Sequence, residues 1–176
     1  MLYHKSRYVE LYQGDCRDIV PRLDDNSIQT VCTSGPDDLE LCCEVLGLLR
    51  NPLIKRGVVF WHRPPKGFAD EAMKLDWLPR GVLPLTYDYI GVLSKQQDAI
   101  WNKDLAYPRM TFFGTRAIEL CVKLSSEDFN YGALLDPFCG DGDLGVVGQK
   151  LRRRTILIGE ECKEVKERLD DASSHA

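Results

Sequence analysis

Hydrophobic residues along the chain form short runs that alternate with segments of helical spacing. Runs rich in β-branched, aromatic and aliphatic residues, each bounded by turn residues, predict strands at residues 8–12, 27–33, 57–61, 87–93, 133–136 and 155–159. Apolar positions three and four apart predict helices at residues 16–23, 38–49, 69–75, 115–124, 144–151 and 164–170. This alternation predicts an α/β fold, in which helices cover both faces of a doubly wound, mostly parallel sheet.

The length of 176 residues is that of one domain, which we expect over residues 1–171, with a frayed tail at residues 172–176. A composition of 44% hydrophobic and 28% charged residues excludes collagen-like and largely disordered chains. The net charge is −4, from 23 basic and 27 acidic residues, so no overall positive field attracts nucleic acid. Any contact with DNA must therefore come from a local patch.

Membrane, disulfide and metal signals are weak in this sequence. No apolar run approaches the roughly 20 residues of a membrane span, and the first residues lack the apolar core of a signal peptide, so we expect a cytoplasmic protein without a membrane partner. The seven cysteines include no C-x-x-C pair, and the three histidines are scattered. We therefore expect reduced, mostly buried thiols and no metal site.

The loop after the strand at residues 133–136 is the first candidate for chemistry. Gly140 and Gly142 let the chain turn tightly, so that backbone N–H groups can approach a ligand before the next helix begins. The following strand ends at Gly159, Glu160 and Glu161, about twenty residues further on, where an acidic side chain can bind the hydroxyls of a ribose. The combination predicts a nucleoside cofactor, although such a loop can also serve only to pack a helix on a strand.

These motifs resemble those of the amino-group DNA methyltransferases with permuted motif order, in which the catalytic loop precedes the S-adenosylmethionine loop. The resemblance rests on residues 11–16, 25–28, 33–36, 135–142 and 159–161, and Tyr107-Pro108 stands where the family has a His-Pro segment. It implies that S-adenosylmethionine is the cofactor. It also implies contacts of the cofactor's methionine end with four residues, of its ribose with Glu161, and of its adenosine region with Asp15. The four residues are Asp136, Phe138, Gly140 and Gly142.

The catalytic tetrad of that family corresponds here to Ser34, Gly35, Pro36 and Asp37. In the family, a side-chain oxygen and a backbone carbonyl accept the hydrogens of an exocyclic amine, while an aromatic ring stacks on the flipped base. Ser34 supplies an oxygen, and the Gly35 carbonyl remains an acceptor. Gly35 replaces a proline, however, and Asp37 replaces the aromatic residue and cannot stack.

Negative charge accompanies both loops. Asp37, Asp38 and Glu40 stand where phosphates would approach, and Asp141 and Asp143 lie close to the expected methionine carboxylate. Trp61, Trp77 and Trp101 are alternative stacking surfaces, although large aromatic residues at strand ends more often belong to the core. The basic residues Lys150 and 152–154 are read as a solvated turn, with contact to phosphate as the alternative.

Three functional hypotheses follow. The first is a DNA methyltransferase acting on N4 of cytosine or N6 of adenine, with Ser34 favouring cytosine. Only about seventy residues separate Trp61 from Gly132, so no sizeable target-recognition domain fits, and we expect weak DNA specificity or a contribution from a homodimer partner. The second is a catalytically inactive relative that keeps the fold for binding or assembly. The third is a methyltransferase acting on RNA or a small amine.

Overall fold

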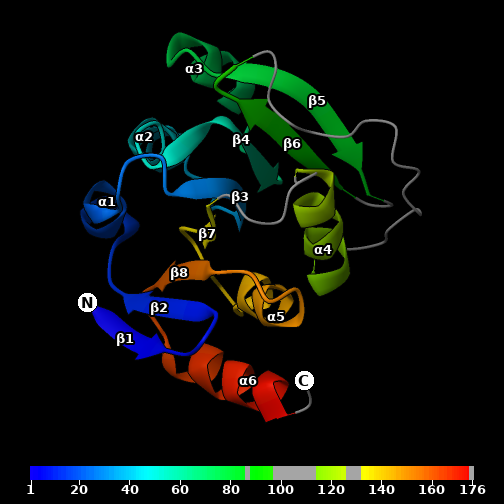
Figure 1. The fold of residues 1–176 in the computed structure, drawn as a ribbon. Coiled ribbons are helices and arrows are strands. Elements are labelled where there is room, and N and C mark those ends of the chain that lie inside the picture. Colours follow the sequence, from blue (N-terminus) through cyan, green and yellow to red (C-terminus); the bar gives the residue numbers. More distant parts are fainter. Residues whose placement is uncertain (86–87, 97–113, 126–131, 175–176) are drawn as a thin grey trace.

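The computed structural model describes residues 1–85, 88–96, 114–125 and 132–174, which form an eight-stranded sheet with helices on both faces (Figure 1). The strands are β1 (Leu2–Lys5), β2 (Val9–Gln13), β3 (Ile28–Ser34), β4 (Leu53–His62), β5 (Leu78–Pro84), β6 (Tyr89–Ser94), β7 (Ala133–Asp136) and β8 (Thr155–Gly159). The helices are α1 (Cys16–Ile19), a 3-10 turn (Val20–Arg22), α2 (Leu39–Leu48), α3 (Phe68–Lys74), α4 (Thr115–Leu124), α5 (Asp143–Lys150) and α6 (Lys163–Ser174).

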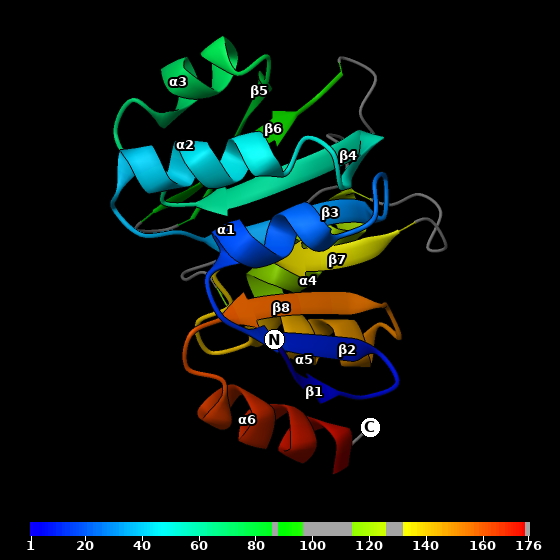
Figure 2. The ribbon, with the colours of Figure 1, turned by 90° about the vertical axis from the view of Figure 1, so that its left-hand side faces the viewer.

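The strand order is β1-β2-β8-β7-β3-β4-β6-β5. The central strands from β2 to β4 are parallel, while β1, β6 and β5 are antiparallel to their neighbours. Helices α1 and α2 cover one face of the sheet, and α4 and α5 cover the other (Figure 2). The predicted doubly wound, mostly parallel α/β fold is therefore confirmed.

The chain reverses its direction of travel across the sheet between β7 and β3. From β3 it passes through α2 to β4 on one side, and from β7 it passes through α5 to β8 on the other. Because these two connections cover opposite faces, the loops after β3 and β7 separate and leave a crevice at the carboxyl ends of the strands. Open α/β sheets bind their ligands at such a position.

Two apolar layers, one on each face, hold the helices on the sheet. One contains the buried side chains of α1, α2 and α3, and the other contains those of α4, α5 and α6. Helix α5 lies especially close to β8, because a Cβ atom on Gly145 would stand 2.7 Å from the side chain of Leu157, and one on Gly148 would collide with Thr155. The small residues of α5 thus fix the helix that follows the glycine loop.

Two strands were absent from the sequence prediction. Strand β5 contains Pro79, Gly81 and Pro84, which read as breaks, but β5 is an edge strand, where a missing N–H group does not interrupt the ladder. Strand β1 lies at the opposite edge and is mostly exposed, so it lacks the apolar pattern of a core strand. Pro21 splits the first predicted helix into α1 and a 3-10 turn.

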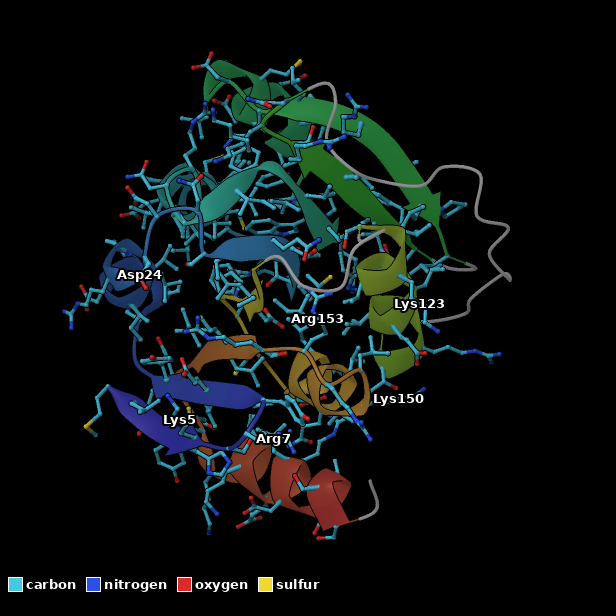
Figure 3. The ribbon with its side chains drawn as sticks, in the orientation of Figure 1. Lys5, Arg7, Asp24, Lys123, Lys150 and Arg153 are labelled. Atoms are coloured by element: carbon cyan, nitrogen blue, oxygen red, sulfur yellow. The ribbon has the colours of Figure 1, made fainter. Side chains whose placement is uncertain are left out.

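Two further expectations are corrected at particular residues. Helix α6 continues to Ser174 rather than fraying from residue 172, because the Gln149 amide donates to the Ser173 hydroxyl at 2.9 Å and ties the last turn to α5. The basic turn before β8 is exposed to solvent except at Arg153, which is labelled in Figure 3. Arg153 is buried and donates to the Gln29 side chain at 2.7 Å. Lys150 and Arg154 are exposed and pair with Glu119 and Glu10.

Candidate functional site

A cavity of about 350 Å³ lies at the carboxyl edge of the parallel strands. It draws residues from four separate segments of the chain, namely the ends of β2 and β8 and the loops after β3 and β7. The predicted site residues Asp15, Pro36, Phe138 and Gly140 are among its lining. A second cavity of about 840 Å³ adjoins it and contains Glu161. The residues common to both cavities are Cys139, Gly140, Gly159 and Glu160.

The glycines of the loop after β7 have different roles. Gly140 is exposed at φ +45° and lines both cavities, and a Cβ atom added to it would have only the Phe138 carbonyl oxygen within 4 Å. Gly142, at φ +77°, is buried instead, and its Cβ would meet the Val165 side chain at 2.6 Å. Gly140 therefore faces the two cavities, whereas Gly142 allows α5 to begin against α6.

Asp136 does not line either cavity within the described part of the chain. Its buried carboxylate accepts a 2.6 Å hydrogen bond from the Thr33 hydroxyl and a 3.1 Å bond from the Phe138 N–H group. Burial raises the pKa of Asp136 to about 7, even though these two hydrogen bonds favour the charged form. Asp136 thus joins β7 to β3 beneath the crevice and shapes the loop that carries Phe138.

Asp15 lines the cavity but is engaged in local contacts. It is the N-cap of α1, where it accepts the Arg17 N–H at 2.8 Å, and it also binds the Arg17 guanidinium at 3.0 Å. The hydrogen bonds from Arg17 lower the pKa of Asp15. One acid of the site therefore already has a cationic partner.

One of the two acids near the glycine loop, Asp143, also has a cationic partner. The Arg168 guanidinium of α6 forms an ion pair with Asp143 and donates to the Asp141 carbonyl oxygen at 2.9 Å. Arg168 also lines the second cavity, beside Glu161, which is exposed. Part of the negative charge expected from the sequence near this loop is thus offset by a cation from α6.

The segment after β3 carries the predicted tetrad. Ser34 is the last residue of β3, and its hydroxyl lies 3.1 Å from Nδ1 of His62. Pro36 reaches the cavity, whereas Asp37 is exposed and lies outside its lining. Asp38 is the N-cap of α2 and accepts the Leu41 N–H at 3.1 Å, which gives this acid a structural role.

Aromatic side chains underlie this segment. Trp61 is fully buried at the end of β4, with its ring 4.7 Å from that of Phe68 and 6.0 Å from that of Phe138. Trp77 is buried as well, and both residues therefore belong to the core, while Trp101 and Tyr107 lie outside the described residues. No aromatic ring among the described lining residues other than Phe138 is available to the first cavity.

Two residues beside the tetrad could not be predicted from the sequence. His62 touches Ser34, and Asp88 touches His62. Their only signal is that His62 ends the strand next to β3, in register with Ser34, and that register cannot be read from the sequence. Trp61, expected either as a stacking surface or in the core, is a core residue that packs against Gly35. Among the described residues, no cluster of His, Cys, Asp or Glu is suited to a metal ion, and no helix is long and apolar enough to cross a bilayer.

Solved structures with the same architecture exist. TTHA0409 of Thermus thermophilus, a protein assigned to the DNA modification methylases and solved with S-adenosyl-L-methionine, superposes with a TM-score of 0.76 over 93% of each chain at 17% identity. This chain has the fold of the DNA methyltransferases. The M1.HpyAVI complex with SAM matches at a TM-score of 0.72 and 15% identity, over 93% of this chain and 98% of that one.

The PvuII DNA methyltransferase, which is cytosine-N4-specific, shares the same methyltransferase fold. It matches at a TM-score of 0.67 and 14% identity, over 99% of this chain and 96% of its own. No protein-family model matches the sequence, and no functionally curated protein matches it either. At such identities the likeness establishes the architecture, and the chemistry must be argued from the site itself.

Proposed function

We propose that this protein is an S-adenosylmethionine-dependent methyltransferase that acts on an exocyclic amine of DNA. One observation carries the proposal: Pro36, next to Ser34 and Gly35, lines the same cavity as Phe138 and Gly140 of the glycine loop. Residues about a hundred positions apart in the sequence thus meet where an open α/β sheet binds its ligand. A methyl donor held by one loop would face an amine held by the other.

The cavity residues fit the cofactor in size and chemistry. The volumes of about 350 and 840 Å³ span the range of small-molecule sites. Gly140 leaves the backbone open to close approach, and Glu160 or Glu161 at the end of β8 can accept from ribose hydroxyls. Arg168 pairs with Asp143, one of the two acids close to the expected methionine end. Bound there, the cofactor supplies an electrophilic methyl group on a sulfonium ion.

The protein's own contribution is to hold and orient the amine. Ser34 Oγ and the Gly35 carbonyl oxygen accept its two hydrogens, so that the nitrogen lone pair turns away from the base and toward the methyl group. The amine nitrogen would then take the methyl group directly: the new N–C bond forms as the C–S bond breaks, the sulfur is left as a neutral thioether, and the nitrogen gives up one proton to water. A covalent cysteine intermediate is disfavoured, because burial raises the pKa of Cys139, the cysteine of the glycine loop, to about 12.

The negative charge around the crevice opposes tight binding of DNA. Asp37 and Glu40 are exposed beside the tetrad, and Glu160 and Glu161 are exposed at the end of β8. Carboxylates repel phosphates, so duplex affinity and sequence selection must come from elsewhere, such as the partner in a homodimer. Exposed Asp37 also favours the second candidate, a non-catalytic relative, because it cannot stack on a flipped base.

A two-part experiment tests the proposal. Titration calorimetry should detect S-adenosylmethionine binding, and tritiated methyl transfer should be measured on single-stranded DNA, duplex DNA, RNA and small amines. We expect transfer to DNA that is lost in Ser34→Ala and kept in Ser174→Ala, a matched serine at the far end of α6. No binding at millimolar cofactor would refute the proposal, and binding without transfer to any acceptor would support the non-catalytic relative.

A further inference from the structure

Three polar side chains line up beside the crevice, on neighbouring strands. Ser34 ends β3, His62 ends β4 at the paired position, and Asp88 directly precedes β6. Ser34 Oγ lies 3.1 Å from His62 Nδ1, and His62 Nε2 lies 3.2 Å from the Asp88 carboxylate. Three strand ends therefore present a continuous chain of hydrogen-bonding groups.

The contacts of Asp88 fix the direction of the hydrogen bonds between Ser34, His62 and Asp88. Arg63 Nε lies 3.0 Å from Asp88 Oδ2, and the Tyr89 N–H donates to Asp88 Oδ1 at 2.9 Å. Both contacts favour a carboxylate that accepts, so the neutral imidazole of His62 carries its hydrogen on Nε2. Nδ1 is then an acceptor, and the Ser34 hydroxyl must donate to it.

We infer that His62, oriented by Asp88, is a positioning residue that takes the hydroxyl hydrogen of Ser34 and leaves the Ser34 oxygen as an acceptor for the target amine. The inference rests on the proposed methyl transfer and identifies what polarises its catalytic serine. A freely rotating hydroxyl can point its hydrogen at the amine and repel it. A hydroxyl engaged with Nδ1 presents only its lone pairs.

Acid conditions should reverse this arrangement. Protonated His62 carries hydrogen on both nitrogens, so Nδ1 becomes a donor and occupies a lone pair of Ser34. Burial lowers the pKa of His62, with Arg63 acting in the same direction and Asp88 opposing it. Because the pKa of His62 lies below its ordinary value of 6.5, the neutral form predominates at pH 7, and the loss of function should occur at a more acidic pH than for an ordinary histidine.

The first test needs no methyl transfer. Nitrogen-15 NMR of the imidazoles, assigned with His62→Asn and His4→Gln, reports which ring nitrogen of His62 carries the hydrogen. We expect the Nε2–H form at pH 7.5, and a shift of the Nδ1 resonance in Ser34→Ala. The Nδ1–H form, or a resonance indifferent to Ser34→Ala, would overturn the inference.

The second test uses kinetics and a graded pair of variants. His62→Leu removes the acceptor and should lower kcat by about 10- to 100-fold, with KM and cofactor affinity nearly unchanged. His62→Asn, whose Oδ1 can replace Nδ1, should recover part of the rate and lose the acid limb of the pH profile. His4→Gln, which alters the histidine paired with Asp170 far from Ser34, is the matched control.

The possible outcomes distinguish the positioning role of His62 from the proposed methyl transfer. Equal kcat in His62→Leu and His62→Asn, or an unchanged acid limb, would overturn the positioning role, provided that circular dichroism confirms folding. Labelling of Ser34 by a fluorophosphonate would also overturn it, because the serine would then be a nucleophile. If the unaltered protein transfers no methyl group, the proposed function fails, while the NMR result still decides whether Ser34 is held as an acceptor.

Discussion

A Cβ atom on Gly35 would lie 2.6 Å from the indole ring of Trp61. Trp61 is fully buried in β4, where it pairs in register with Thr33 of β3, so the ring has no room to withdraw. Any other residue at position 35, proline included, carries that Cβ atom. The glycine in the tetrad is therefore explained by the tryptophan beneath it.

Replacing this glycine should destabilise the protein. We expect Gly35→Ala to lower the free energy of unfolding by about 1–3 kcal/mol, which is the usual cost of overpacking a filled core. In a Trp61→Phe background the same change should cost less, because a smaller ring leaves space. Urea unfolding followed by circular dichroism gives the double-mutant cycle, with Gly47→Ala, which meets nothing within 4 Å, as control. If the effects of Gly35→Ala and Trp61→Phe on the free energy of unfolding were strictly additive, the proposed contact between the two positions would be contradicted.

The buried carboxyl of Asp136 should make stability depend on pH. Its pKa rises from 3.8 to about 7 on folding, so its contribution is full below pH 4 and is lost as the pH rises toward 7. Asp136→Asn keeps the acceptor oxygen and lacks this titration. The stability of the variant relative to the unaltered protein should therefore improve between pH 4 and 7, by at most about 1.4 kcal/mol per pH unit.

Comparing the two proteins cancels the other titrating groups, including Asp15 and Glu119, whose pKa values are lowered by Arg17 and Lys123. Urea unfolding across pH 4.5–8 measures the difference. A difference independent of pH would mean that the Asp136 carboxyl is not buried as described.

Gly140 offers a selective test of the cofactor crevice. In Gly140→Ala the new methyl group meets only the Phe138 carbonyl oxygen at 3.9 Å, but it stands where the two cavities join. We expect the left-handed backbone to cost about 1–2 kcal/mol of stability, and S-adenosylmethionine affinity to fall at least about tenfold.

Gly67→Ala is the control that separates the effect of backbone strain from that of a methyl group placed in the crevice. Gly67 also has positive φ, and its Cβ would make only an ordinary 3.7 Å contact with Leu39, outside the crevice. It should lose similar stability and keep the cofactor affinity measured by calorimetry. Equal affinity losses in both variants would remove Gly140 from the binding site.

The cysteines should resist alkylation in the folded protein. Burial raises the pKa of Cys16 to about 11 and that of Cys42 and Cys139 to about 12, so few thiolates exist at pH 8. Cys43, which is partly exposed, should react first with iodoacetamide, as peptide mass spectrometry would reveal. Rapid labelling of Cys139 would instead indicate that the glycine loop opens.

The alternation of strands and helices was predictable because it is recorded locally. The period of a strand or helix shows in a few neighbouring residues, and the strands between the two edges of the sheet carry strong apolar runs. The edge strands β1 and β5 do not, because one side of each lacks a partner strand and tolerates polar residues and proline. Only their pairing in the sheet defines them.

The candidate site divides in the same way. The loops at Ser34–Pro36 and Phe138–Gly140 were predictable, since turn residues directly after an apolar strand mark the edge where ligands bind. The role of each side chain was not. Asp136 and Gly142 belong to the same motif as Gly140, but both are buried in the protein.

The sequence by itself determined the class of fold and the two loops that meet at its crevice, because short-range patterns encode both. The tertiary structure alone decided that His62 and Asp88 stand behind Ser34, and that Trp61 fills the space beside Gly35. These contacts depend on the register of strands distant in sequence. That register is set by burying whole faces of the sheet against helices, which no local stretch of residues records.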